Sequence, residues 1–96
     1  MSRNSFRIRE YIDHMLEAIR RINDYTANLS EAEFLNTLLI QDGVIRNIEI
    51  LGEAAHNIIR HHPDFSRAHN NIPWEDIYFM RNQVAHGYFS VDLVIV

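Results

Sequence analysis

The sequence predicts an all-α protein, an up-and-down bundle of four to five helices. Apolar residues recur at alternating steps of four and three along two long stretches, which is the spacing of one helix face. The chain has only 3 Gly and 2 Pro, so long helices with short connections are favoured over a many-stranded sheet. Its 96 residues are enough for one domain, which we place over residues 1–96.

The first predicted helix begins at Asn4 or Ser5, either of which can cap its N-terminus. Its apolar face is formed by five residues: Ile8, Ile12, Met15, Ile19 and Ile22. The stretch NDYTANLS, residues 23–30, has weak helix propensity and is expected to end the helix.

A second helical region is predicted to begin at Ser30. Ser30 followed by Glu33 matches a capping box, in which each side chain hydrogen-bonds to the other residue's backbone N–H. The region continues to His61 or His62, with a break near residues 36–37 that separates a short helix from a long one.

The long helix of this region has an apolar face formed by five residues: Val44, Ile48, Leu51, Ala55 and Ile58. Two glycines, Gly43 and Gly52, lie inside the helix. Each costs about 1 kcal/mol relative to Ala in that position. We therefore expect a neighbouring helix to approach closely at these residues.

Residues 63–73, PDFSRAHNNIP, are predicted to form a loop, because they are rich in turn-forming residues. Pro63 disfavours helical backbone at the residue before it. The last full helix begins near Pro73, whose fixed φ suits a first turn, and Gly87 is placed as its terminator. Residues 90–96, SVDLVIV, are expected to form a short C-terminal helix that another part of the protein, such as a second subunit, covers.

The charge and composition exclude several classes of function. A formal charge of −4 argues against binding nucleic acid through a broad cationic surface, although it leaves room for a local basic site. Without cysteine, the chain has no thiolate chemistry and no zinc finger. The polar N-terminal stretch lacks the apolar segment of a secretory signal, and no apolar run approaches the roughly 20 residues of a membrane span. We expect a cytoplasmic protein that does not contact a membrane.

The stretch MRNQVAHGY, residues 80–88, concentrates polar side chains of catalytic type in an apolar helical context. Asn82 and His86 are four residues apart and share a helix face. Arg81 and His86 are five apart, which turns them about 140° from each other on a regular helix. If two copies of the helix meet across a two-fold axis, the Arg and His of the two copies can converge on one cleft.

These residue types are sufficient for cleaving RNA without a metal or a cofactor. Arg81 offers a permanent charge and a forked donor for phosphate, and His86 can transfer protons near neutral pH. Asn82 can orient the imidazole or bind a phosphate oxygen. A structural alternative remains open, in which His86 stabilises a helix C-terminus and Arg81 is either solvated or paired with Glu49 or Glu53.

The segment RNQVAHGY resembles the signature of HEPN-domain ribonucleases and, more narrowly, of the HepT toxins that are paired with MntA-type minimal nucleotidyltransferase antitoxins. DGVIRNIEILGEAAHNI, residues 42–58, is similar to the long central helix of that family. IPWEDIYFMRNQVAHGYFSVDL, residues 72–93, resembles its closing segment. The resemblance covers nearly the whole chain, although family members usually continue into a fuller last helix.

The resemblance implies an all-α homodimer with the catalytic cleft at the subunit interface. It also implies metal-independent endoribonuclease activity in a type VII-like toxin–antitoxin pair, in which RNA is the substrate and a minimal nucleotidyltransferase is the antitoxin. By position, Arg81 and His86 are the catalytic pair and Asn82 supports them. Tyr88 matches the tyrosine to which the antitoxin adds AMP.

Other residues admit two interpretations each. Arg46 either forms a row of ion pairs with Glu49 and Glu53 or adds a phosphate contact to the cleft. The six histidines do not show the H-E-x-x-H spacing of a zinc site, so no metal is predicted. Trp74 is expected to anchor the last helix to the core rather than to stack on a base.

Two other functions fit the same sequence. The first is a non-catalytic helical partner that binds substrate for a nucleotidyltransferase, which the acidic composition favours. The second is a helical adaptor without chemistry.

Overall fold

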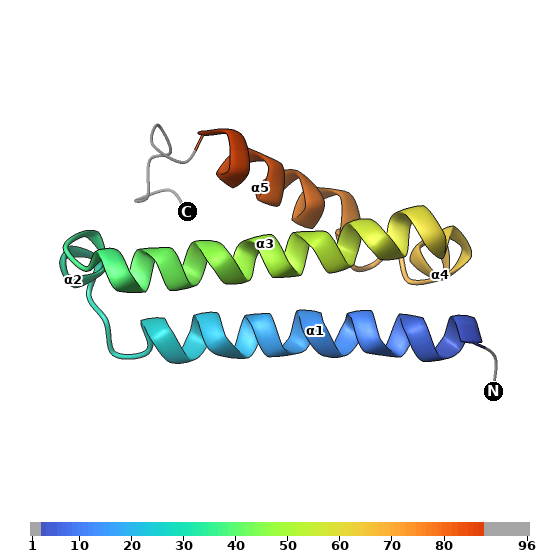
Figure 1. Ribbon diagram of the computed structural model, residues 1–96, viewed down its shortest axis with the longest axis horizontal. Helices are drawn as coiled ribbons and strands as arrows, with labels where there is room; N and C mark the ends of the chain where they lie inside the picture. Colours follow the sequence, from blue (N-terminus) through green and yellow to red (C-terminus); the bar gives the residue numbers. More distant parts are fainter. Residues whose placement is uncertain (1–2, 88–96) are drawn as a thin grey trace.

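The computed structural model describes residues 3–87, and within them all regular structure is helical. Five helices follow one another: α1 (Arg3–Thr26), α2 (Glu31–Leu35), α3 (Leu38–His61), α4 (Pro63–Ala68) and α5 (Trp74–Gly87). Helices α1 and α3 lie antiparallel. Helix α5 packs on the side of α3 that faces away from α1, and its chain runs in roughly the same direction as that of α1 (Figure 1). The predicted all-α, up-and-down arrangement is confirmed.

The apolar face of α1 is turned slightly from its predicted position. Met15 is buried as expected, but Ile19 is 41% exposed and the buried face passes through Ala18 instead. The predicted step from Met15 to Ile19 is therefore wrong. A step of three brings Ala18 under α3, where a small side chain lets the two helices lie close together.

The break between α2 and α3 lies where the sequence predicted it. Ser30 Oγ accepts from the Glu33 backbone N–H at 3.1 Å, and Glu33 Oε1 accepts from the Ser30 backbone N–H at 3.2 Å, so the predicted capping box is confirmed. The Gln41 side-chain amide donates to the carbonyls of Phe34 and Leu35 at 2.9 Å. These two hydrogen bonds satisfy C-terminal carbonyls of α2 and fix the short helix to the start of α3.

Residues 63–73 are not a continuous loop, as the sequence suggested, because α4 (Pro63–Ala68) occupies their first half. Pro63 is the first residue of α4, a position where its missing N–H is not needed and its fixed φ favours the helix. His62 has an extended φ of −137° and lies between α3 and α4. Pro63 thus ends one helix and begins the next.

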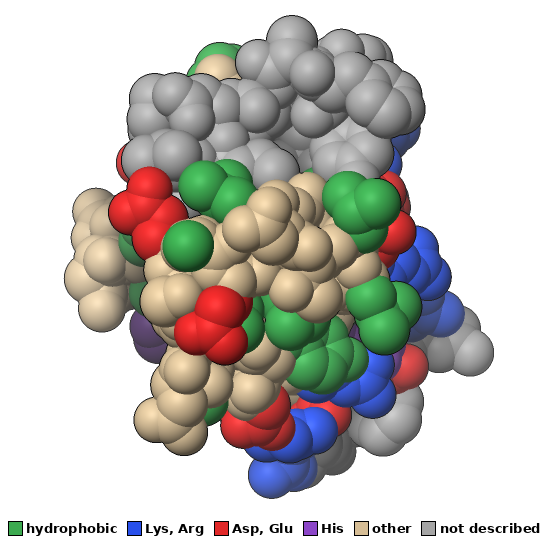
Figure 2. All heavy atoms as spheres, turned by 90° about the vertical axis from the view of Figure 1, so that its left-hand side faces the viewer, with side chains coloured by type: hydrophobic (Ala, Val, Ile, Leu, Met, Phe, Trp, Pro, Cys, Tyr) green, Lys and Arg blue, Asp and Glu red, His purple; other side chains and the backbone are tan. Residues whose placement is uncertain are grey.

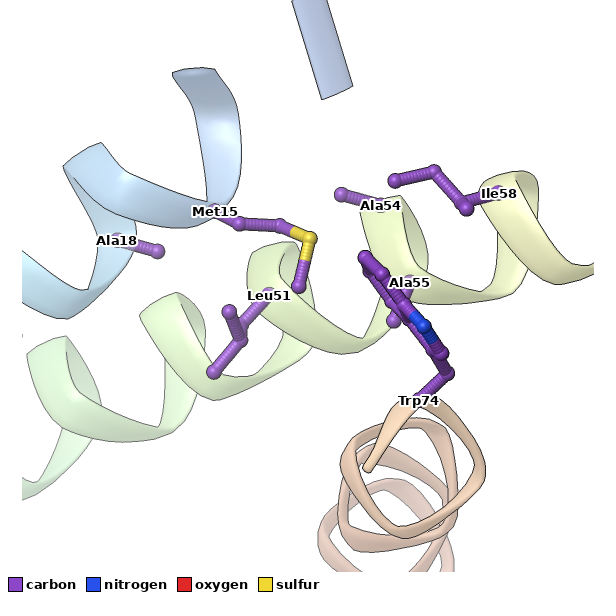
Figure 3. Close-up of a cluster of buried hydrophobic side chains, with 7 residues drawn as sticks. All are labelled: Met15, Ala18, Leu51, Ala54, Ala55, Ile58 and Trp74. Carbon is purple, nitrogen blue, oxygen red and sulfur yellow. The ribbon is translucent and has the colours of Figure 1, made fainter. Parts of the chain in front are cut away.

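The main core lies where α1 and α5 meet α3 (Figure 3). It contains seven buried residues: Met15, Ala18, Leu51, Ala54, Ala55, Ile58 and Trp74. All five residues predicted for the apolar face of α3 are buried. Trp74 is only 5% exposed, and its indole N–H donates to the His69 carbonyl at 3.1 Å. The predicted role of Trp74 as an anchor for the last helix is confirmed.

Two predictions concern the C-terminal end of the chain. The short helix expected over residues 90–96 lies outside the described residues, and Gly87 is the last residue described in α5. Gly87 as a terminator therefore stays a prediction. Within residues 3–87, no helix combines the length and the apolar character that a membrane crossing requires.

Candidate functional site

Arg81 is the sequence-predicted site residue whose surroundings the structure defines best. It lies on α5 with a side chain that is 33% exposed. Its Nη2 is 3.2 Å from Glu53 Oε2 on α3, and its Nη1 donates to Asn82 Oδ1 at 3.1 Å. The guanidinium is therefore held between a carboxylate of the central helix and the amide of the next residue. The ion pair with Glu53 is one of the three situations that the structural alternative allowed for Arg81.

Gly52 explains how α5 comes near enough to α3 for this contact. A Cβ placed on Gly52 would lie 2.1 Å from Arg81 Cβ, 2.7 Å from Arg81 Cγ and 3.4 Å from the Ile77 carbonyl oxygen. Only glycine permits that approach. The expectation that a neighbouring helix passes close to Gly52 is confirmed, and the helix is the one that carries Arg81.

The guanidinium of Arg81 opens onto a groove of about 400 Å³ that residues from three helices line. The groove residues are Tyr11 and His14 of α1, Arg81 of α5, and Arg46, Glu49, Ile50, Glu53, Ala54 and Asn57 of α3. Two arginines and two glutamates make its charge mixed rather than cationic. This agrees with the net charge of the chain: any anion bound here is bound by a few aimed donors, because no broad positive field is present.

Arg46 is exposed and lines the groove together with Arg81. Within residues 3–87, neither Glu49 nor Glu53 forms an ion pair with it, so the predicted row of ion pairs on α3 is wrong. Glu53 is paired with Arg81 instead. The other interpretation of Arg46, as a second phosphate contact in the cleft, is compatible with its position.

The other predicted site residues are placed less completely. Asn82 is half-buried, and its side-chain oxygen accepts from Arg81, so its described contact supports the guanidinium. His86 belongs to the last turn of α5, but its side chain is not described. Tyr88 lies outside the described residues. The structure thus brings Arg81 and Arg46 to one groove, with Asn82 hydrogen-bonded to Arg81 outside its lining. The relation of Arg81 to His86 stays a prediction.

Sequence reasoning missed Tyr11, His14 and Asn57 as groove residues. Asn57 could have been found, because Arg46, Glu53 and Asn57 lie seven and four residues apart and share one face of a helix. No signal in the sequence identifies the face of α1 that borders the groove.

Among the residues that the structure describes, no group of three or more His, Cys, Asp or Glu side chains could hold a metal ion.

The clearest electrostatic perturbation lies beside the groove, on α1. Glu17 lines a second hollow of about 280 Å³ that shares His14 and Ile50 with the groove. A side-chain hydrogen bond from Arg20 lowers the pKa of Glu17 from its ordinary 4.5 to about 2, and Arg21 assists. The side chains of Glu17 and Arg20 are 45% and 59% exposed, so this network is a surface feature.

Comparison with known proteins assigns the chain to a family. A sequence model for the family described as "Ribonuclease HepT-like" matches residues 15–96. "Probable ribonuclease HepT" from Thermococcus cleftensis is 38% identical over 88 residues, which are 92% of this chain and 77% of that protein. The chain belongs to the HepT-like ribonuclease family, as the sequence analysis expected.

Two proteins of Methanocaldococcus jannaschii show further similarity. One, named "Putative RNase", is 30% identical over 93% of this chain and 79% of its own length. Another, named "Gamma-glutamylcyclotransferase and putative RNase", is 40% identical over 90% of this chain, but the match covers only 37% of that larger protein. No solved structure matches the chain. Family membership supports the predicted enzyme class, ribonuclease.

Proposed function

We propose that the chain is a metal-independent endoribonuclease that acts as the toxin of a type VII-like toxin–antitoxin pair in the cytoplasm. It cleaves RNA by attack of a ribose 2′-OH on the adjacent phosphorus. The observation that carries the proposal is the position of the Arg81 guanidinium, which Glu53 and Asn82 hold at the groove. Arg81 lies on α5, the helix that also contains His86.

Each side chain has a distinct task in the proposed reaction. Arg81 neutralises the charge that develops on the phosphorane, where a fixed donor is most effective. Asn82 orients that guanidinium through its side-chain oxygen. His86 transfers a proton, which an imidazole can do near neutral pH. Arg46, in the same groove, adds a contact to a neighbouring phosphate.

The proposed active species is a homodimer. On one helix, Arg81 and His86 diverge by about 140°, so a second copy is needed to bring both types of group to one phosphate. Several large apolar side chains in the described part of the chain are exposed, among them Leu38 at 71%, Leu39 at 82% and Phe79 at 60%. Hydrophobic side chains also appear on the surface at the α2 end of the molecule (Figure 2). Exposed apolar surface of this kind supports association.

The proposed regulation is the addition of AMP to Tyr88 by a minimal nucleotidyltransferase antitoxin. Tyr88 follows His86 by two residues, so a phosphate-bearing group on it would lie near the RNA site. The added negative charge would repel RNA and the added bulk would block entry.

The test of the nuclease is RNA cleavage in EDTA by wild type, Arg81→Ala and His86→Ala. We expect products with 2′,3′-cyclic phosphate ends from wild type and a loss of about 10²–10⁴-fold in each variant. Equal cleavage by all three proteins would indicate a contaminating nuclease. It would favour the second candidate, a non-catalytic partner of a nucleotidyltransferase, which the mixed charge of the groove also fits.

The test of the regulation is incubation of the protein with ATP and a minimal nucleotidyltransferase of the MntA type. We expect a mass increase of one or more AMP units on wild type and none on Tyr88→Phe. An unchanged mass of wild type, with a nucleotidyltransferase shown to be active on another acceptor, would remove the modification from the proposal.

A further inference from the structure

The proposed reaction needs two proton transfers, and only one residue has been assigned to them. The 2′-OH must lose a proton as it attacks, and the 5′-oxygen must gain one as it leaves. His86 can serve at one of these positions. The groove contains a carboxylate, Glu53, whose contact with Arg81 places it beside the phosphate that Arg81 would bind.

Glu53 is accessible and lies close to the phosphate-binding group, as a general base in this reaction requires. Its side chain is 55% exposed and lines the groove, so substrate can reach it. Its Oε2 is 3.2 Å from Arg81 Nη2, and a ribose 2′-oxygen is separated from its 3′-phosphate by only a few bonds. A guanidinium has five N–H donors, so Arg81 can contact Glu53 and a phosphate at the same time.

We propose that Glu53 is the general base of this ribonuclease, an inference that depends on the proposed function. The Glu53 carboxylate takes the proton of the 2′-OH, and the 2′-oxygen forms a bond to phosphorus. The bond from phosphorus to the 5′-oxygen breaks, and His86 gives that oxygen a proton. The products are a 2′,3′-cyclic phosphate and a 5′-hydroxyl, with Glu53 protonated and His86 neutral at the end of the step. Exchange of protons with water restores both residues.

The other titratable groups of the groove are less well placed. His14 and Tyr11 come from α1, and Glu49 comes from α3, one turn before Glu53. Within residues 3–87, none of the three forms a hydrogen bond or an ion pair with Arg81, whereas Glu53 does. Arg46 and Arg81 are the two arginines of the groove, and Arg81 is the one that pairs with Glu53.

The first experiment separates a base from a residue that only positions Arg81. Glu53→Gln keeps an acceptor for the guanidinium but cannot take a proton. We expect kcat to fall by about 10²–10⁴-fold, while KM is unchanged or lower because a negative charge has left the groove. Glu49→Gln also removes one negative charge from the groove, so it measures the effect of the charge change without the loss of the proposed base. Glu10→Gln, on the exposed surface of α1, is the control for the substitution itself.

The second experiment separates the base from the acid. In a dinucleotide whose 5′-bridging oxygen is replaced by sulfur, the leaving thiolate needs no proton, because a thiol is far more acidic than an alcohol. We expect this substrate to restore the rate of His86→Ala and not that of Glu53→Gln.

Wild-type kcat in Glu53→Gln would overturn the assignment of Glu53 while leaving the proposed function intact. Restoration of Glu53→Gln by the sulfur substrate would make Glu53 the acid and would also overturn it. Absence of wild-type cleavage, or full activity of both Arg81→Ala and His86→Ala, would remove the proposed function and this inference with it.

Discussion

Gly43 and Gly52 lie on the same helix and each faces a neighbour, yet the two contacts differ in kind. A Cβ on Gly52 would lie 2.1 Å from Arg81 Cβ, an atom fixed to the backbone of α5. A Cβ on Gly43 would lie 3.1 Å from Tyr25 Cε2, at the far end of a side chain that is 42% exposed. The first contact can be relieved only by moving a helix, the second by moving a ring.

The comparison shows how differently the two sides of α3 are built. Helix α5 approaches α3 at the level of the backbone, and this approach positions Arg81. Near Gly43, helix α1 contacts α3 through the half-exposed side chain of Tyr25. The side of α3 that carries the proposed chemistry therefore has much less tolerance for added volume than the other side.

The largest effect is expected for Gly52→Ala. The new methyl group would overlap Arg81 Cβ, and the clash should outweigh the roughly 1 kcal/mol that Ala gains over Gly in a helix. We expect a net destabilisation of about 2 kcal/mol, measured by urea unfolding, and a loss of RNA cleavage because Arg81 moves. A variant as stable and as active as wild type would contradict the close approach of α5.

A smaller loss is expected for Trp74→Phe, which weakens the other anchor of α5. The substitution removes the hydrogen bond from the indole N–H to the His69 carbonyl and leaves a space in the core. We expect a destabilisation of about 1–2 kcal/mol in the same urea assay. An unchanged free energy of unfolding would mean that Gly52 alone determines the docking of α5.

Gly43→Ala is expected to have the opposite sign. The Tyr25 ring can move into solvent, so the gain in helix propensity should prevail and stabilise the protein by up to about 1 kcal/mol. The thermal unfolding midpoint should rise, and RNA cleavage should be unchanged. A destabilisation similar to that of Gly52→Ala would remove the distinction between the two contacts.

The smallest effect concerns the surface of α1 and depends on pH. The pKa of Glu17 is lowered to about 2 in the folded protein, so its ion pairs stabilise the fold above about pH 4.5. That contribution is lost as the pH falls from 4.5 toward 2. We expect the thermal midpoint of wild type to decrease more over this interval than that of Glu17→Gln. Parallel decreases would show that the network adds nothing to stability.

Periodicity and capping residues predicted most of the helices, because these signals are local. Ser30 and Glu33 identified the start of α2, and the apolar face of α3 was correct at every position. The short helix α4 was missed, because Pro63 was interpreted only as a residue that ends helices. The error at Ile19 arose because four-residue and three-residue steps both fit a helix, and contact with α3 decides between them.

The site was predicted in part for the same reason. Arg81 and Asn82 are adjacent in sequence, so their association was visible in the chain itself. The ion pair of Arg81 with Glu53 joins residues 28 positions apart, and the sequence offered Glu49 as an equal partner. The contribution of α1 to the groove depends on how α1 packs along α3, which no local pattern encodes.

Helices α1 and α5 both pack mainly along α3. The two sides of the groove, formed by Tyr11 and His14 on α1 and by Arg81 on α5, are therefore both attached to the same helix. The width of the groove is therefore determined by one continuous helix of 24 residues, and not by a hinge between two domains. A bulky ligand can widen such a groove only by bending or sliding a helix, and that deformation is resisted along the whole core. Within each protomer, selection among ligands should therefore follow their shape and not their ability to induce closure.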